Sequence, residues 1–150
     1  MHHERQDPDV RFSTDPARLD LGVIHGFLST CYWSPGIPLA AVERAIRHSL
    51  PFGLYDLAPA TPAQVGFARI ITDFASFAYL CDVFILESHR GRGLSKRLME
   101  FVLAHPDLQR LRRVALFTRD AHALYARYGF APMPDPTRYM EIARPGVYPA

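Results

Sequence analysis

The sequence predicts a mixed α+β domain with a mainly antiparallel central sheet flanked by helices, and three observations lead to this prediction. Apolar residues recur with the helical period in four segments. Other apolar segments are shorter and follow the period of strands. The segments follow the order helix, helix, three strands, helix, strand, helix and two short strands, which is typical of helices packed against one sheet.

Two helices are predicted near the amino terminus. Asp20 is suited to cap the first helix, which has an apolar stripe at helical spacing. This stripe consists of Ile24, Phe27, Leu28 and Cys31. A turn at residues 33–36 leads to the second helix, which has Pro38 in its first turn. Its expected inward residues are Leu39, Val42 and Ile46.

Three strands are predicted in the middle of the chain, at residues 52–57, 64–72 and 77–86. A hairpin turn at residues 73–76 joins the last two strands. Alternate residues of the third strand are expected to share one face. They are Phe77, Tyr79, Cys81, Val83 and Ile85.

The remaining elements follow residues 89–95, which lead directly into a helix that ends at His105 and Pro106. The apolar stripe of this helix consists of Leu94, Leu98, Phe101 and Val102. A strand at residues 113–118 comes next, then a helix that Asp120 is suited to cap and Gly129 is suited to end. The inner face of that helix is expected to hold Ala121, Leu124, Tyr125 and Tyr128. We expect short strands at Phe130 and at residues 139–142.

The composition indicates one domain over residues 1–150, with residues 1–9 flexible. The chain is 49% apolar with a net charge of +2, which is too small to indicate a nucleic acid or a membrane as partner. No apolar run is long enough to span a bilayer. The two cysteines, Cys31 and Cys81, lie in apolar segments and are typical of a reducing compartment, so we expect a cytoplasmic protein.

The turn at residues 89–95 has the features of a phosphate-binding loop. It connects a strand to the start of a helix, where unpaired N–H groups attract anions. Gly91 and Gly93 allow the backbone to approach a ligand closely. Basic side chains surround the loop: His89, Arg90, Arg92, Lys96 and Arg97. The alternative interpretation is a tight turn with solvated arginines.

The spacing of the loop excludes two nucleotide-binding motifs. No Gly-Lys-Ser/Thr follows the glycines, so a nucleoside triphosphatase is not indicated. The third glycine of a dinucleotide fingerprint would fall on Lys96, and residues 111–113 are basic where an acidic residue would be needed.

Residues 90–95, Arg-Gly-Arg-Gly-Leu-Ser, resemble the Gln/Arg-x-x-Gly-x-Gly/Ala loop that binds pyrophosphate in the GNAT superfamily of acyl-CoA-dependent N-acyltransferases. Ser95 departs from this pattern, because it stands at the position of Gly or Ala. Residues 123–130 resemble the Leu-Tyr-x-x-x-Gly-Phe motif of the same family. The two motifs occur in the family's order across about two-thirds of the chain. The resemblance implies acetyl transfer from acetyl-CoA to a primary amine, without a metal, in an acyl-CoA N-acyltransferase fold.

The resemblance also implies a cofactor site. In this family the strand before the loop separates from its neighbour and pairs with the pantetheine arm. That role falls here on Val83, Phe84 and Ile85, which a buried central strand would explain equally well. The implied pyrophosphate contacts fall on Arg90, Gly91, Arg92, Gly93, Leu94, Ser95 and Lys96.

Tyr125 matches the family's tyrosine that protonates the leaving thiolate, although its position on an apolar helix face is also typical of a core residue. A base must deprotonate the amine, and the candidates are Asp82 and Glu87. Asp82 has a rival interpretation as an ion pair with Arg69, which the expected hairpin places opposite Leu80. Tyr79 stands near the position where relatives often carry a catalytic glutamate.

The acceptor site is expected near the two amino-terminal helices and their joining turn. Tyr32 and Trp33 either form a wall for the substrate or close the end of the core. Tyr79 is a further candidate for this site, and His122 either lines it or caps a helix. The expected acceptor is a small molecule or a peptide, and uncovered strand edges near the carboxyl terminus make a homodimer plausible. The alternative function is a non-catalytic acyl-CoA-binding sensor or scaffold.

Overall fold

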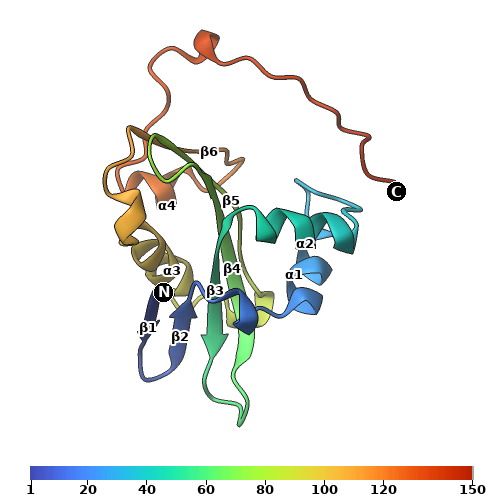
Figure 1. Ribbon diagram of the computed structural model, residues 1–150, viewed down its shortest axis with the longest axis vertical. Coiled ribbons are helices and arrows are strands. Elements are labelled where there is room, and N and C mark those ends of the chain that lie inside the picture. Colours follow the sequence, from blue (N-terminus) through green and yellow to red (C-terminus); the bar gives the residue numbers. More distant parts are fainter. Residues whose placement is uncertain (150) are drawn as a thin grey trace.

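The computed structural model describes residues 1–149, and its centre is a six-stranded sheet in the order β1-β2-β3-β4-β5-β6 (Figure 1). The strands are β1 (Glu4–Gln6), β2 (Val10–Ser13), β3 (Leu50–Asp56), β4 (Ala63–Thr72), β5 (Phe77–Ile85) and β6 (Arg113–Leu116). The first five are antiparallel to their neighbours, and β5 and β6 are parallel. The predicted fold class, a mainly antiparallel sheet flanked by helices, is confirmed.

Helices cover both faces of this sheet (Figure 1). One face carries α1 (Leu21–Leu28) and α2 (Leu39–Arg47), and the other carries α3 (Leu94–Leu103) and α4 (His122–Ala126). Short 3-10 helices occupy Pro16–Arg18, Glu87–His89, Pro106–Leu108 and Pro136–Arg138. Within residues 1–149, no helix has both the length and the apolar character needed to cross a membrane.

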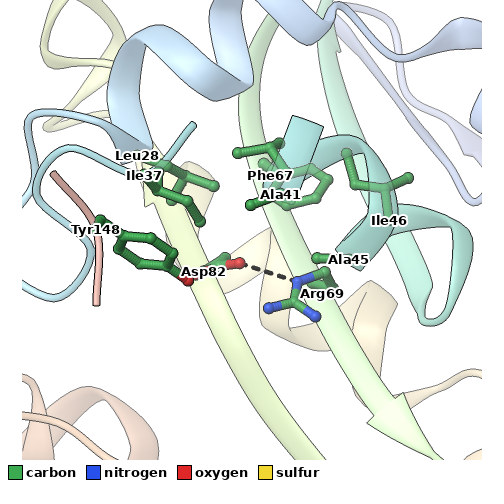
Figure 2. Close-up of a pocket in the computed structure, with 10 residues that line it drawn as sticks. Leu28, Ile37, Ala41, Ala45, Ile46, Phe67, Arg69, Asp82 and Tyr148 are labelled. Carbon is green, nitrogen blue, oxygen red and sulfur yellow. Dashed lines mark hydrogen bonds and ion pairs between the residues drawn. The ribbon is translucent and has the colours of Figure 1, made fainter. Parts of the chain in front are cut away.

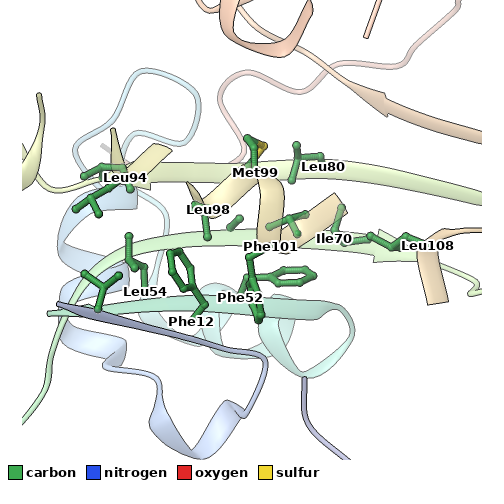
Figure 3. Packing of buried hydrophobic residues seen from close by; sticks show 14 of the residues in the cluster. Phe12, Phe52, Leu54, Ile70, Leu80, Leu94, Leu98, Met99, Phe101 and Leu108 are labelled. Atoms are coloured by element: carbon green, nitrogen blue, oxygen red, sulfur yellow. The ribbon is translucent and has the colours of Figure 1, made fainter. Parts of the chain in front are cut away.

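The two faces have separate apolar cores. The larger core lies under α3 and includes the aromatic residues Phe12, Phe52 and Phe101 (Figure 3). The smaller core lies under α1 and α2 and includes Phe67 of β4. Because neighbouring strand residues point to opposite faces, Phe67 joins the smaller core whereas Ala68 joins the larger one. The sheet is therefore covered on both faces and holds the helices in fixed positions.

Most of the predicted helix ends agree with the structure. The side chain of Asp20 caps α1 by accepting from the Val23 N–H at 3.1 Å, and Gly129 follows α4 with a φ of 92°. Two details were wrong. Leu39 is exposed rather than inward, because it begins α2 on the solvent side. Asp120 does not cap α4, since Ala121 takes the capping position and its own N–H is bound by Thr118 Oγ1.

A bulge in β5 overturns the prediction of one continuous face. Ala78 and Leu80 are buried in the larger core, and so is Ile85. Even-numbered residues therefore face the larger core in the first part of β5, and odd-numbered residues face it in the last part. The change occurs at Asp82, whose φ of 55° interrupts the extended backbone, and the register with β4 shifts there. Tyr79 and Cys81 therefore face the α1 and α2 side, opposite Val83 and Ile85.

The two strands predicted near the carboxyl terminus are not formed. Phe130 and residues 139–142 have no strand pairing, and the chain extends away from the sheet before it returns toward α2 (Figure 1). Three prolines, at positions 132, 134 and 136, remove N–H donors from this segment. Residues 131–147 are all exposed, so no neighbouring strand is available to pair with them.

Two strands near the amino terminus were not predicted. Residues 1–9, which we expected to be flexible, contain β1, and β1 pairs with β2 in an antiparallel hairpin. Arg97 of α3 anchors this hairpin through ion pairs with Asp7 at 2.6 Å and Asp9 at 2.9 Å. These carboxylates raise the pKa of Arg97 further above its usual range, Asp9 contributing most. The side chain of Arg97 is therefore committed to the hairpin.

Candidate active site

The site forms where β5 and β6 separate. The parallel ladder between them covers only Phe77–Leu80 of β5 and Arg113–Leu116 of β6. The rest of β5, residues 81–85, has no partner on that side, although it remains paired with β4. A length of strand edge is therefore exposed in the middle of the protein, directly before the glycine loop.

The direction of the β5 backbone can be followed from its contacts with neighbours. Leu86 donates its backbone N–H to the Val65 carbonyl at 2.8 Å, so this N–H points toward β4. Because this direction alternates along an antiparallel strand, Val83 and Ile85 direct their backbone groups away from β4. The Ile85 carbonyl accepts from Arg90 Nε at 3.1 Å, which agrees with that direction.

The glycine loop opens α3 next to this edge. Gly91 and Gly93 have φ values of 79° and 71°, in the region that glycine adopts without strain. A Cβ at either position would meet no atom within 4 Å, so open space lies beside both. Gly93 is the capping residue and provides no side chain to bind the first amides of α3. The buried side chain of Leu94 holds the start of this helix against the sheet.

The charged residues near the loop have different roles. Arg92 and Lys96 are exposed beside the start of α3. Arg90 binds the Ile85 carbonyl. His89 binds Asp56 at 2.8 Å and so ties the loop to the end of β3. The pKa of Asp56 is lowered, mainly by the Ala58 N–H and then by His89.

Tyr125 lies on α4 and is buried, with its ring packed edge-on against Phe130 at 5.8 Å. Burial raises the pKa of Tyr125, and the proximity of Tyr32 and Asp120 raises it further. Among residues 1–149, no group hydrogen-bonds its hydroxyl. This arrangement keeps the phenol protonated and leaves its proton available to a ligand.

Asp82 and Arg69 form the ion pair that the sequence suggested. Arg69 Nε lies 2.9 Å from Asp82 Oδ2, and both side chains are largely buried. The predicted register was off by one residue, since Arg69 faces Cys81 rather than Leu80. Trp33 donates from Nε1 to Asp82 Oδ1 at 3.0 Å. Both carboxylate oxygens are therefore engaged by donors.

A cavity of about 90 Å³ adjoins this ion pair (Figure 2). Apolar side chains of α1, α2 and β4 form most of its wall, and Arg69 and Asp82 complete it. Tyr148, near the end of the chain, also lines the cavity (Figure 2). Among residues 131–149, Tyr148 is half-buried and all the others are exposed, so the tail is docked at this point. This contact could not be predicted from the sequence, because the tail has neither periodicity nor a motif.

The expected acceptor residues are only partly brought together. Tyr32 and Trp33 are 50% and 40% exposed, which does not fit a plug for the core. Their rings pack edge-on at 5.1 Å, and Arg119 lies 3.8 Å above the Tyr32 ring. Arg119 precedes α4 and Tyr32 follows α1, so this contact joins the segments that lie on either side of the place where β5 and β6 separate. The contact was not predicted from the sequence.

The other candidates lie farther from the cavity. Tyr79 is half-buried and packs against Phe117 at 5.8 Å; burial, followed by Cys81, raises its pKa. His122 and Glu87 are exposed. Burial raises the pKa of the Cys81 thiol to about 12, which does not favour a thiolate nucleophile. Within residues 1–149, no cluster of His, Cys, Asp and Glu is arranged to hold a metal ion.

Comparison with known proteins gives three informative matches. A family model described as "Acetyltransferase (GNAT) domain" matches residues 58–132. The chain is 35% identical over 136 residues to "Putative acetyltransferase FG08082" of Gibberella zeae, covering 79% of this chain and 77% of that protein. The crystal structure of a GNAT-family protein from Xanthomonas campestris pv. campestris shares 55% identity and a TM-score of 0.88, covering 97% of this chain and all of that one.

Proposed function

This chain belongs to the GNAT family of acetyltransferases, and from that premise we propose that it transfers an acetyl group from acetyl-CoA to a primary amine by direct attack in a ternary complex. The observation that carries the proposal is the open edge of β5 beside the start of α3. It offers backbone groups to an extended ligand arm next to helix amides suited to a diphosphate. Acetyl-CoA supplies the thioester that the amine attacks.

The residues present fit acetyl-CoA. Val83 and Ile85 would pair with the pantetheine arm along the unpaired edge, whereas Phe84, between them, directs its backbone groups toward β4 and its side chain into the smaller core. The diphosphate would lie at the first turn of α3, where the space beside Gly91 and Gly93 lets a ligand approach the backbone. The remaining contacts would come from Arg90, Arg92, Leu94, Ser95 and Lys96. A backbone N–H of β5 near Val83 would polarise the thioester carbonyl.

We assign Tyr125 as the acid that protonates the leaving thiolate. Its hydroxyl is unengaged, and its raised pKa keeps it protonated at neutral pH. An ordinary phenol has a pKa of ~10, above the ~8.5 of an ordinary thiol, so proton transfer to a free thiolate is uphill in pKa. The transfer would therefore depend on the hydroxyl lying beside the sulfur as the thioester bond breaks.

The two candidate bases, Asp82 and Glu87, differ in their position relative to the cavity. Asp82 lines the cavity of Figure 2, which we name the acceptor cavity, and each of its oxygens accepts one hydrogen bond and keeps a second lone pair for an N–H of the amine. Glu87 is exposed at the end of β5 and does not line the cavity. We therefore propose that Asp82 orients the amine and that the proton leaves directly to Asp82 or to solvent.

A non-catalytic acyl-CoA-binding module is the second candidate function, and the engagement of both Asp82 oxygens is the observation that favours it. Thiol release from acetyl-CoA should be measured against a panel of amines, amino acids and peptides. An enzyme releases thiol faster when a suitable amine is present. Binding of acetyl-CoA without amine-dependent thiol release would instead identify the sensor or scaffold.

A further inference from the structure

A basic groove between α2 and β4 adjoins the acceptor cavity. This groove has a volume of about 470 Å³ and is lined by Ala41, Arg44, Ala45, His48, Arg69 and Ile71. It shares Ala41, Ala45 and Arg69 with the acceptor cavity. The two spaces are therefore neighbours, and Arg69 lines both.

The lining of the groove contains three nitrogen-bearing side chains and no carboxylate. Arg44 and His48 are exposed, and neither forms an ion pair within residues 1–149. Basic residues in the last turn of a helix also complement its dipole, which explains Arg47 as well as Arg44. The dipole does not explain Arg69, because that residue lies on β4 and reaches the same groove from the sheet.

The guanidinium of Arg69 is held rigidly but is not fully used. Its Nε binds Asp82, and its Nη1 has only a long contact of 3.4 Å with Ser49 Oγ. Its Nη2 has no hydrogen-bond partner within residues 1–149, although the side chain is only 14% exposed. A guanidinium fixed in this way presents further N–H donors in the geometry that carboxylates and phosphates require.

We propose that the acceptor is a small amine that carries an anionic group, either a carboxylate or a phosphate. The amine lies in the acceptor cavity beside Asp82, and the anionic group lies in the groove against Arg44, His48 and Arg69. The small volume of the cavity limits the amine end to a few atoms, whereas the groove is open to solvent. This inference rests on the proposed acetyltransferase function.

The test compares anionic acceptors with neutral partners that carry the same amine. β-Alanine is paired with β-alaninamide, and O-phosphoethanolamine is paired with ethanolamine. In the wild type, kcat/KM for the better of the two anionic amines should exceed that of its neutral partner about tenfold or more, as expected for charge-assisted hydrogen bonds. The pair with the larger ratio of kcat/KM shows whether the groove binds a carboxylate or a phosphate.

Arg44→Gln should raise KM for the anionic amine about tenfold, with little change in kcat or in the neutral amine's kinetics. Arg47→Gln is the matched control, because Arg47 is an exposed arginine on the same helix that lines neither cavity. Equal kcat/KM for charged and neutral amines would overturn the inference. So would equal effects of the two arginine substitutions.

A binding measurement separates this inference from the proposed function. Trp33 is the chain's single tryptophan and binds Asp82, so its fluorescence reports on the acceptor cavity. N-acetyl-β-alanine and N-acetyl-O-phosphoethanolamine should change this emission in the wild type and in Arg47→Gln, with about tenfold weaker binding in Arg44→Gln. If no amine supports thiol release but this pattern holds, acetyl transfer fails and the anion site stands. If neither anion changes the emission of a protein that turns over neutral amines, the anion site is wrong and acetyl transfer stands.

Discussion

Tyr125 combines a largely buried ring with a hydroxyl that has no hydrogen-bond partner within residues 1–149 and is not fully enclosed. A fully buried phenol is normally hydrogen-bonded, because leaving it unpaired costs free energy, whereas an accessible hydroxyl can bind water until a ligand arrives. The side chain is 9% exposed and packs against Phe130, so its position is fixed while its proton remains available. This is the arrangement expected of a group that donates to a ligand.

Tyr125→Phe should lower kcat by about 10²-fold, the usual contribution of one acid catalyst. The dissociation constant for CoA and the melting temperature should change little, because the ring is kept and the hydroxyl makes no hydrogen bond within residues 1–149. Steady-state kinetics with isothermal titration calorimetry would check both expectations. An unchanged kcat would remove Tyr125 from the mechanism.

The pH profile should report the same residue. Burial raises the pKa of Tyr125, and the acid must be protonated to act, so kcat should persist up to pH ~10 and fall only as pH rises through the raised pKa. Tyr125→Phe should lack this decline. The measurement is kcat against pH, with circular dichroism at each point to confirm that the protein stays folded. A wild-type decline centred below pH 9 would point to a different group.

Asp82→Asn should destabilise the protein by about 3 kcal/mol, because it leaves the largely buried Arg69 without its counter-charge. Urea denaturation measures this loss. The double variant Asp82→Asn with Arg69→Gln should recover part of the stability, since both charges are then removed. Activity is read as kcat with a neutral amine, because Arg69 is assigned to the anionic group of the acceptor. If this kcat returns with the stability, Asp82 acts through structure; if it does not, Asp82 takes part in the reaction.

At the scale of elements, the decisive feature is the junction of β5, the glycine loop and α3. Much of this junction could be predicted, since an apolar strand, two glycines and an amphipathic helix are local signals. The bulge at Asp82 could not, because it depends on how β4 pairs with β5. The separation from β6 is also nonlocal, since it is set by where residues 113–116 lie. Sequence patterns therefore predicted the strand, the loop and the helix of the candidate site, but not the direction in which its side chains point.

Gly93→Ala tests this junction. It should cost about 1 kcal/mol of stability, because alanine is strained at a φ of 71°. Its methyl group should also weaken CoA binding about tenfold or more, since it would project where a diphosphate approaches. Gly129→Ala is the matched control, because Gly129 also has positive φ and open space but lies after α4. Similar CoA affinities for the two variants would contradict the loop's assigned role.

At the scale of the whole molecule, both ends of the chain return to the domain through side-chain contacts. The amino-terminal hairpin is held by Arg97, 88 and 90 residues away from its partners Asp9 and Asp7. The carboxyl-terminal tail contacts the domain through Tyr139, whose ring packs edge-on against Phe117 at 5.2 Å, and through Tyr148, which lines the cavity. Strands of three and four residues and a tail without apolar periodicity carry too little local information to be predicted. Their placement follows from contacts between distant residues.

Tyr148→Ala should enlarge the acceptor cavity and so shift acceptor preference toward bulkier amines. We expect the ratio of kcat/KM for a bulky amine to that for a small one to rise about tenfold, with CoA affinity unchanged. Val147→Ala serves as the control, because Val147 is an exposed neighbour in the same tail. A constant ratio across the three proteins would show that the tail has no influence on selectivity.

The docking of Tyr148 has a practical consequence for anyone who purifies this protein. An affinity tag fused to the carboxyl end would begin almost at this aromatic ring and would compete with its placement. Enzyme prepared with such a tag should accept a broader range of substrates than enzyme tagged at Met1, which is fully exposed. Proteolytic removal of the tag should narrow that range again.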